Sequence, residues 1–423
     1  MTNEKSFGIK ERYKAMNVSQ KYWWKVVALC FVGWILMYGD RTILNPVQTQ
    51  IAAQYHINNT QLGLANSIFF LAYALTQIPF GMLGDKFGRR LVIMAGFLVF
   101  GIMTGMTGLA TTFGIFLMFR VVAGAGQGTY YGPQYALSTE AIPTKDLTLG
   151  TAIINSGMAF GTSGGYLLSS KLVLENGMSW KVPFFIMAIP TVIVGVLFMV
   201  LLKERVIRPE DKAKVDQSND EKANEHVSVG SLFKNKNLLL AFILCFCSIY
   251  ANFVIITWLP QFLQVERGFE GTSVGFISSL VPWASIPGAI IFARIYDKTK
   301  KTKQLIWLLV PISLLSVFGI AFIENRTLLI IVLILYGLTG KLAIDPILVA
   351  FVSKNSPRSS LSTALSAYNF IGMSGSILAP YVTGWISDSF GSMKIGFYLA
   401  AFLLLIGVIL FSFTTDKKEI AVK

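Results

Sequence analysis

Apolar runs of about 20 residues recur along the whole chain, and short polar or charged stretches separate them. As an α-helix, a run of this length spans a hydrocarbon core of roughly 30 Å. The pattern therefore predicts an all-α integral membrane protein that crosses the bilayer twelve times. The predicted spans are 22–44, 60–82, 90–110, 113–138, 148–170, 182–202, 237–262, 271–294, 303–322, 327–352, 361–386 and 392–414.

Polar segments divide these spans into two groups of six. The first 21 residues are charged and lack the short apolar core of a signal peptide, so the first span is expected to remain. Residues 203–236 are rich in Lys, Glu, Asp and Asn, which is typical of a linker. We predict a cytoplasmic segment 1–21, a six-helix bundle 22–202, a cytoplasmic linker 203–236, a second six-helix bundle 237–414 and a cytoplasmic tail 415–423.

Similar residues recur at a nearly constant separation in the two groups of spans. The matching pairs are Asp85 with Asp297, Pro133 with Pro346, and Asn155 with Asn369. Such an offset indicates an internal duplication, so the two bundles should be pseudo-symmetric. Duplicated halves of this kind place a substrate site between them near the middle of the bilayer.

The charge balance reports topology. The chain is 54% hydrophobic and 14% charged, and its net charge is +14. Most of the 36 Lys and Arg fall in loops that are cytoplasmic if both termini are cytoplasmic. The basicity then follows the positive-inside rule, and no nucleic-acid partner is expected. The lipid bilayer is the expected environment, and we expect a multi-pass monomer in the cell membrane.

Cysteine and histidine exclude several kinds of chemistry. The three Cys fall inside predicted spans, where they behave as small hydrophobic residues, so no disulfide framework is indicated. Both His lie in predicted loops, so any proton that is carried across the membrane must be bound by a carboxylate. No metal cluster or nucleophile–base pair is present in the pattern. We therefore expect that the protein is not an enzyme, has no catalytic residues and binds no cofactor or metal.

Apart from the Lys and Arg at the ends of the spans, which count with the adjoining loops, five charged residues fall inside predicted spans: Asp40, Arg41, Arg120, Lys341 and Asp345. Charge at membrane depth is costly and normally points into protein or water, so it is functional by default. The three cations exceed the two acids by one charge. A cavity with this balance would attract an anion, and a guanidinium can bind a carboxylate through two parallel hydrogen bonds.

The helix that carries Arg120 has a polar face. At helical spacing Arg120, Gly124, Gln127 and Tyr131 share one side, and the small residues let another group approach. This face should line a partner helix or a cavity. The alternative is an arginine that merely pairs with another helix.

Asp40 and Arg41 are neighbours near the end of the first span. Helical neighbours project about 100° apart, so they cannot fully satisfy each other, and each should meet another helix. Tyr38 shares a face with Arg41 at i and i+3. The alternative is local charge neutralisation at a helix end.

Lys341 and Asp345 lie four residues apart in the tenth span, next to Pro346. They could simply pair, or Lys341 could face the substrate site at a depth comparable to Gln127. Pro346 loosens the backbone hydrogen bonding there, which would suit a moving helix.

The loop between the second and third spans reads Gly84-Asp85-Lys86-Phe87-Gly88-Arg89-Arg90. In position and spacing it resembles the signature of the major facilitator superfamily. The resemblance implies two bundles of six helices. It also implies that Asp85, Arg89 and Arg90 act in gating through ionic contacts between helices. An ordinary basic loop would explain the arginines but not the glycines and Asp85.

A narrower resemblance covers nearly all of the predicted spans. The chain is similar to the anion:cation symporter family, which includes carriers of sugar acids, tartrate, sialic acid and glutamate. The matching positions are Tyr38-x-Asp40-Arg41, Tyr73 with Gln77 and Pro79, Arg120 with Pro133, and Asn369-x-x-Gly372-x-x-Gly375 with Pro380 and Gly384.

The resemblance implies that Arg41 and Arg120 interact with the transported anion. It also implies that Asp40 takes part in proton coupling. Gln127 departs from the pattern, because the family commonly has a glutamate there. A glutamine cannot carry a proton, so coupling through this position is excluded.

The leading interpretation is a proton-coupled symporter of a small organic carboxylate, a hydroxylated or sugar acid, that works by alternating access. An anion exchanger or uniporter would use the same arginines without a titrating acid. A drug or metabolite exporter and a nutrient sensor are less favoured, the first because of the positive balance. Asp40 and Asp345 are the candidate proton-coupling residues. The expected substrate-binding residues are Tyr38, Arg41, Tyr73, Arg120, Gln127, Tyr131, Lys341 and Asn369.

Overall fold

The computed structural model describes residues 16–17, 21–143, 146–204, 206–207, 234–356 and 361–415. All twelve stretches predicted to span the membrane are helical, which confirms the all-α prediction. Nearly all of the predicted segment 1–21, linker 203–236 and tail 415–423 lies outside the described residues.

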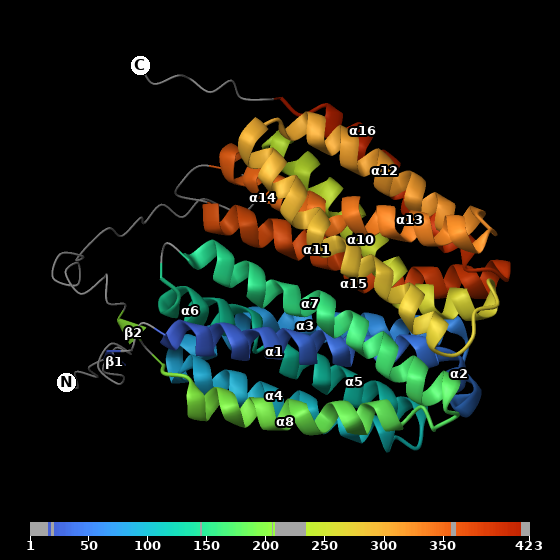
Figure 1. Ribbon diagram of the computed structural model, residues 1–423, viewed down its shortest axis with the longest axis horizontal. Coiled ribbons are helices and arrows are strands. Elements are labelled where there is room, and N and C mark those ends of the chain that lie inside the picture. Colours follow the sequence, from blue (N-terminus) through green and yellow to red (C-terminus); the bar gives the residue numbers. More distant parts are fainter. Residues whose placement is uncertain are drawn as a thin grey trace, which may run out of the picture. The chain divides into compact units, whose positions relative to one another are not determined.

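The helices of the first half begin at Tyr22 and end at Leu201 (Figure 1). They are α1 (Tyr22–Thr42), the short turn η2 (Asn45–Val47), α2 (Gln48–Tyr55), α3 (Asn59–Phe87), α4 (Arg89–Gly108), α5 (Phe113–Gln127), α6 (Tyr131–Ala141), α7 (Leu147–Ser169), the π-helical turn η4 (Ser170–Glu175) and α8 (Val182–Leu201). Two short strands, β1 (Met16–Asn17) and β2 (Val206–Ile207), pair in parallel.

The second half contains long helices that begin after the linker. They are α10 (Lys236–Val265), α11 (Thr272–Thr299), α12 (Thr302–Phe322), α13 (Arg326–Thr339), α14 (Lys341–Asn355), α15 (Leu361–Phe390) and α16 (Lys394–Ser412).

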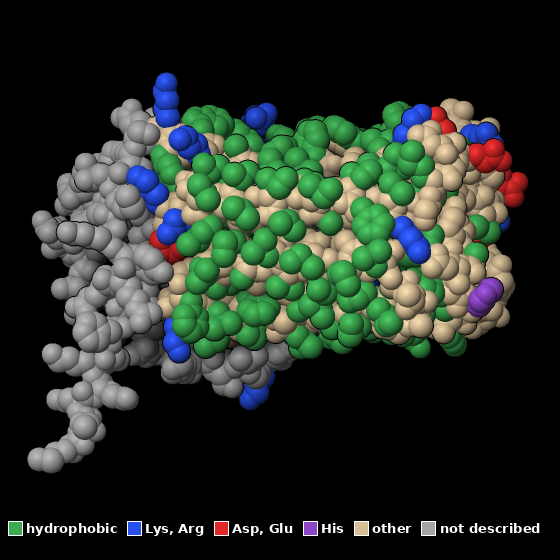
Figure 2. Space-filling view, turned by 90° about the horizontal axis from the view of Figure 1, so that it is seen from below, with side chains coloured by type: hydrophobic (Ala, Val, Ile, Leu, Met, Phe, Trp, Pro, Cys, Tyr) green, Lys and Arg blue, Asp and Glu red, His purple; other side chains and the backbone are tan. Residues whose placement is uncertain are grey.

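The helix surfaces suit a lipid environment. Nine helical segments in the described part of the chain are long and apolar enough to cross a membrane. On the face shown in Figure 2, hydrophobic side chains cover the sides of the helices, and charged side chains lie mainly near the helix ends. Large apolar side chains such as Ile78 and Val200 are each 70% exposed, as expected where lipid replaces water.

Two predicted spans are broken rather than continuous. The span predicted over 113–138 ends as α5 at Gln127 and restarts as α6 at Tyr131. Pro133 lies in the first turn of α6 and has no backbone N–H to continue the ladder of α5. The span predicted over 327–352 breaks at Gly340, whose backbone is extended.

The described chain packs as two compact units that are not continuous in sequence. Unit 1 contains the described residues that fall within 1–43, 68–165 and 178–220. Within it α4 packs against α5 and α8, and these helices run side by side in Figure 1. Gly101 permits the close approach of α4 to α8, because a Cβ there would lie 2.9 Å from the side chain of Thr191.

Unit 2 contains the described residues that fall within 44–67, 166–177 and 221–423. Within it α10 packs against α15, α16 and η2. The Asn45 side chain donates to the carbonyl of Ile256 at 2.9 Å, and the Tyr166 hydroxyl donates to the same carbonyl at 2.6 Å. These contacts join η2 and the end of α7 to α10.

Candidate functional site

Asp40 lies in the last turn of α1 and is fully buried. Its two carboxylate oxygens are bound from two other helices. The hydroxyl of Thr104 on α4 donates to Oδ1 at 2.6 Å, and the side-chain amide of Gln127 on α5 donates to Oδ2 at 2.7 Å. The expectation that Asp40 meets another helix is confirmed.

Gln127 also contacts the neighbouring arginine. Its Oε1 accepts a hydrogen bond from Nε of Arg41 at 2.8 Å. One amide on α5 therefore joins an acid and a base that are adjacent on α1 but point in different directions. Arg41 thus meets another helix too, as predicted, and the bond is shorter and stronger than an ordinary neutral one because one partner is charged.

The Arg41 guanidinium lies among aromatic rings. Its Cζ is 4.8 Å from the ring centroid of Tyr38, 4.4 Å from that of Tyr73 and 5.6 Å from that of Phe70. Rings at these distances stabilise a cation through their negative faces. Arg41 is 6% exposed, and among the residues that the structure describes its Nη2 has no hydrogen-bond partner. The hydrogen-bonding capacity of this nitrogen is therefore unused within the described structure.

Arg120 is also buried, with 1% of its surface exposed. Its Cζ lies 4.2 Å from the ring centroid of Phe69 on α3. The close approach of α3 depends on Gly124, one turn further along α5, where a Cβ would lie 2.3 Å from the Phe69 carbonyl oxygen. Within the described ranges, Nε and Nη2 of Arg120 have no hydrogen-bond partner. Leaving such groups unpaired in a buried site costs free energy.

Asp40, Arg41 and Arg120 form one electrostatic cluster in unit 1. Each arginine interacts with Asp40, and the two arginines interact with each other. Two cations face one acid, so the cluster carries an excess of one positive charge when Asp40 is ionised. Buried positive charge with unpaired N–H groups is suited to an acceptor with negative charge.

Tyr131 was expected on the same helix face as Arg120 and Gln127, on the assumption that one helix continues through all three. Gln127 is the last residue of α5, and Tyr131 begins the separate helix α6. The Tyr131 side chain is 38% exposed, and its ring lies 6.2 Å from that of Trp34. The Gly128–Tyr130 turn between the two helices breaks the helical spacing on which the prediction relied.

A second polar cluster lies in unit 2. The Lys341 Nζ is 3.9 Å from Oδ2 of Asp345, so these residues do pair along α14. The hydroxyl of Tyr368 on α15 donates to Oδ1 of Asp345, and the thiol of Cys245 on α10 donates to the Tyr368 carbonyl at 3.9 Å. Asn369, the predicted ligand on α15, is exposed beside Tyr368.

The α3–α4 turn holds a third cluster. Gly88 alone separates the two helices, and its φ of 109° favours glycine. Arg89 is 3.5 Å from Asp85 and also pairs with Glu140 at the end of α6. The predicted contacts between helices at this loop are thereby observed.

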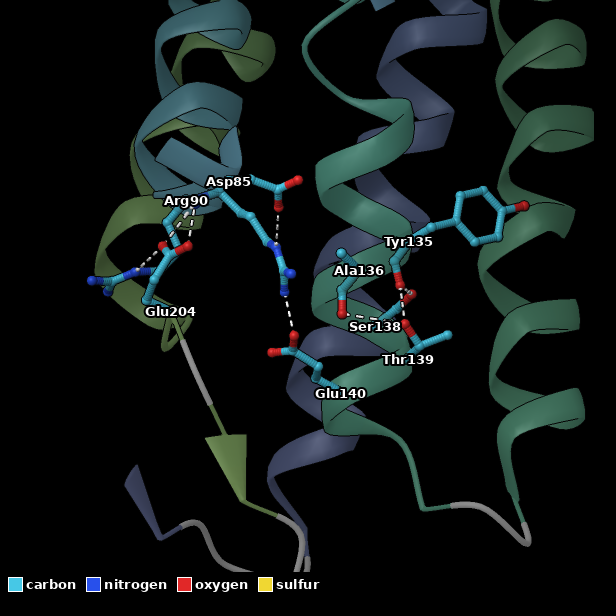
Figure 3. A network of polar contacts seen from close by, with 9 residues as sticks. Asp85, Arg90, Tyr135, Ala136, Ser138, Thr139, Glu140 and Glu204 are labelled. Carbon is cyan, nitrogen blue, oxygen red and sulfur yellow. Dashed lines mark hydrogen bonds and ion pairs between the residues drawn. The ribbon is translucent and has the colours of Figure 1, made fainter. Parts of the chain in front are cut away.

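Glu204 completes this third cluster from the segment after α8. Its Oε2 accepts from the backbone N–H of Arg90 at 3.0 Å and lies 3.4 Å from the Arg90 Nε, while its Oε1 accepts from the backbone N–H of Arg89 (Figure 3). A carboxylate at the first turn of α4 complements the positive end of the helix dipole.

Several residues that complete these clusters were not anticipated from sequence. They are Thr104, Phe69, Tyr368, Glu140 and Glu204. A threonine or phenylalanine in an apolar span gives no signal of its own, because packing decides which helix it meets. Across the parts of the chain that are described, no group of three or more His, Cys, Asp or Glu is placed to hold a metal ion.

Comparison with known proteins decides the family. The family model described as Major Facilitator Superfamily matches residues 30–380 and, again, residues 313–423. The chain belongs to the Major Facilitator Superfamily. It is therefore a multi-pass membrane transporter with the major facilitator fold.

The relatives of this superfamily member include carriers of organic acids. The chain is 23% identical to a hexuronate transporter of Bacillus subtilis, covering 89% of this chain and 90% of that one. It is 24% identical to a sialic acid transporter of Escherichia coli, covering 90% of each. A solved bacterial homologue of the human lysosomal transporter Spinster shares the fold, with a TM-score of 0.77, 16% identity, and coverage of 93% of this chain and 97% of that one.

Proposed function

We propose that this protein transports a small organic carboxylate across the cell membrane by proton-coupled symport and alternating access. The observation that carries the proposal is the pair of buried arginines, Arg41 and Arg120, whose N–H groups are not all used inside the described structure. A carboxylate supplies the acceptors that these groups lack. Its charge also offsets the positive excess of the cluster.

The wider site follows from the same cluster. The Arg41 guanidinium lies over the rings of Tyr38 and Tyr73, so in this proposal the two tyrosines position it for the substrate. Arg120 supplies a second guanidinium. The hexuronate and sialic acid relatives support a sugar acid as the substrate class.

Asp40 is the proposed proton carrier. It is buried, and it accepts hydrogen bonds from the neutral groups of Thr104 and Gln127 while two arginines lie within electrostatic reach. Asp345 is the second candidate, although Lys341 and Tyr368 already bind it. An exchanger or uniporter is the alternative, favoured by the neutral Gln127 where the symporter family commonly has a glutamate.

The remaining predicted residues have supporting roles in this proposal. Lys341 offsets the negative charge of Asp345 in unit 2. Asn369 and Tyr131 are exposed polar residues that can contact the substrate. Asp85, Arg89 and Arg90 act in gating at the α3–α4 turn. We place both termini in the cytoplasm, following the positive-inside distribution of Lys and Arg.

Uptake into proteoliposomes tests the proposal. The full-length protein is reconstituted and offered labelled D-glucuronate, D-galacturonate, L-tartrate or N-acetylneuraminate, with D-glucose as the uncharged counterpart of glucuronate. We expect uptake of at least one acid, none of glucose, and accumulation only under an inside-alkaline pH gradient. Equal uptake of glucose and glucuronate would remove the carboxylate from the proposal. Gradient-independent uptake that is stimulated by internal substrate would establish the exchanger.

A further inference from the structure

Pro260 leaves one backbone carbonyl of α10 without its helical partner. In an α-helix the carbonyl of residue i accepts a hydrogen bond from the N–H of residue i+4, and proline has no N–H. Pro260 lies inside α10, so the Ile256 carbonyl receives no such bond. A carbonyl without a donor inside a membrane protein costs free energy, and therefore this oxygen needs donors from elsewhere.

Two side chains supply those donors, and both come from the first half of the sequence. The Asn45 amide in η2 donates to the Ile256 carbonyl at 2.9 Å, and the Tyr166 hydroxyl near the end of α7 donates to it at 2.6 Å. Asn45 and Tyr166 are each 2% exposed, so water does not compete easily for these bonds. A carbonyl oxygen has two lone pairs, and the two donors use both of them.

We propose that Asn45 and Tyr166 form a latch on the Ile256 carbonyl, which holds the first-half segments 44–67 and 166–177 against α10 and releases them during transport. The inference rests on alternating access in the proposed function, but it does not depend on which substrate is carried. Asn45, Tyr166 and Pro260 are then positioning residues, because they act through the packing of helices and not through contact with the substrate.

The latch residues lie where the chain passes from one compact unit to the other. One segment of unit 1 ends at Ile43, just before Asn45, and another ends at Gly165, just before Tyr166. The segments that follow pack with the second half of the sequence, within unit 2. Alternating access requires the two sequence halves to separate on one side of the membrane in one phase of the cycle. Contacts between first-half segments and α10 therefore break and re-form.

The other contacts of these segments with α10 suit a joint that opens. The Gln264 amide donates to the Pro46 carbonyl at 2.9 Å, and the Gln261 amide donates to Oδ1 of Asn59 at 2.8 Å. Gln48 in α2 is fully buried, and its side-chain nitrogen and oxygen have no hydrogen-bond partner among the described residues. When the joint opens, water can bond all these neutral groups, which offsets part of the free energy lost with the latch.

Distances between the two sequence halves test the latch. Spin labels are placed on Ala53→Cys in α2 and Thr327→Cys in α13, because both positions are exposed. Pulsed EPR measures the distance between the labels on the full-length protein in lipid nanodiscs, without substrate. We expect two populations in the wild type, a shorter distance for the latched form and a longer one for the open form.

Removal of one donor should shift these populations. Tyr166→Phe keeps the ring but loses the hydroxyl, so the ratio of the open to the latched form should rise about three- to tenfold, as expected for one neutral hydrogen bond. Asn45→Leu removes the other donor and should act in the same direction. Tyr130→Phe is the matched control, because Tyr130 is also buried and donates to the Cys30 carbonyl at 2.8 Å, within unit 1. It should leave the ratio unchanged.

Pro260→Ala separates the latch from a simple bend in α10. The new backbone N–H would bond the Ile256 carbonyl and leave one lone pair for two side-chain donors, so the ratio should rise as in Tyr166→Phe. In the Tyr166→Phe background the same change should add little, since two donors then match two lone pairs. Pro311→Ala is the control. Pro311 also lies inside a helix, α12, but no side chain in the described ranges donates to the Trp307 carbonyl, four residues before it.

The outcomes distinguish the latch from the proposed function. An unchanged ratio in either Tyr166→Phe or Asn45→Leu overturns the two-donor latch. An effect of Pro260→Ala that adds in full to that of Tyr166→Phe also overturns it, because the bend of α10 would then act independently of the donors. Carboxylate recognition survives both results, since the uptake assay tests it separately. Conversely, failure to take up any of the four acids overturns the proposed substrate class and leaves the latch standing.

Discussion

Arg120 is a buried cation, and some of its N–H groups have no hydrogen-bond acceptor in the described part of the protein. Its guanidinium lies over the Phe69 ring, in an approach that Gly124 permits. Structural arginines in membrane helices normally find acceptors on neighbouring helices. Arg120 instead keeps unpaired nitrogens within the described structure, which is the arrangement expected of a ligand-binding group.

Arg120→Lys should therefore weaken substrate binding although it conserves the charge. An ammonium cannot form two parallel hydrogen bonds to a carboxylate or stack on a ring as a planar group does. Loss of one charged hydrogen bond of about 1.5–3 kcal/mol corresponds to an affinity lower by roughly ten- to a hundredfold. Titration of the tightest-binding acid measures this. Arg326→Lys, on the exposed Arg326, is the matched control. Unchanged affinity in Arg120→Lys would remove Arg120 from the site.

The residue scale also shows what sequence could and could not predict. That Asp40 and Arg41 turn to other helices followed from helical geometry alone, because neighbours project in different directions. The identity of their partners did not follow. Thr104 lies in an apolar span like many membrane threonines, and only the packing of α4 within unit 1 brings it to Asp40.

At the scale of elements, one local break changed the expected site. Continuous helical spacing placed Tyr131 beside Arg120, but α5 stops at Gln127. Gly128 fits closely against α3, where a Cβ would lie 2.2 Å from the Thr76 hydroxyl oxygen. Pro133 was visible in the sequence as a signal for a break, yet proline is also tolerated inside membrane helices. The tertiary contact decides between the two.

Asp388 on α15 holds the first turn of α3 within unit 2. Its carboxylate accepts from the backbone N–H of Asn59 at 3.1 Å and of Thr60 at 2.7 Å. A carboxylate at a helix N-terminus satisfies donors that have no partner inside the helix. Asp388→Ala should therefore destabilise the packing of α3 on α15 by about 1 kcal/mol.

Thermal unfolding in detergent measures this loss as a lower midpoint. Asp297→Ala is the matched control, because Asp297 is exposed and its Oδ1 lies 2.9 Å from Nζ of Lys300, the residue that follows α11. The control should leave the midpoint unchanged. Equal midpoints for Asp388→Ala and the wild type would show that the Asp388 contact contributes nothing to stability.

For the whole molecule, hydrophobic periodicity was sufficient to predict the fold class. Runs of membrane length and a near-constant offset between halves pointed to a twelve-helix carrier, and the family match supports that architecture. Periodicity could not predict which helices associate most closely. Residues 44–67 and 166–177 cluster with unit 2 through contacts such as Asn45 with Ile256, which depend on side-chain shape and not on hydropathy.

Proton coupling through Asp40 is the central claim, and it is tested most directly in proteoliposomes that contain wild type or Asp40→Asn. Asparagine has nearly the same shape and can still accept from Gln127, but it cannot release a proton. Wild type should accumulate the labelled acid under an inside-alkaline pH gradient. Asp40→Asn should lose this accumulation yet exchange labelled for unlabelled acid at saturating concentration, since exchange needs no proton release. Gradient-driven accumulation that persists in Asp40→Asn would contradict the account and assign the proton to another acid.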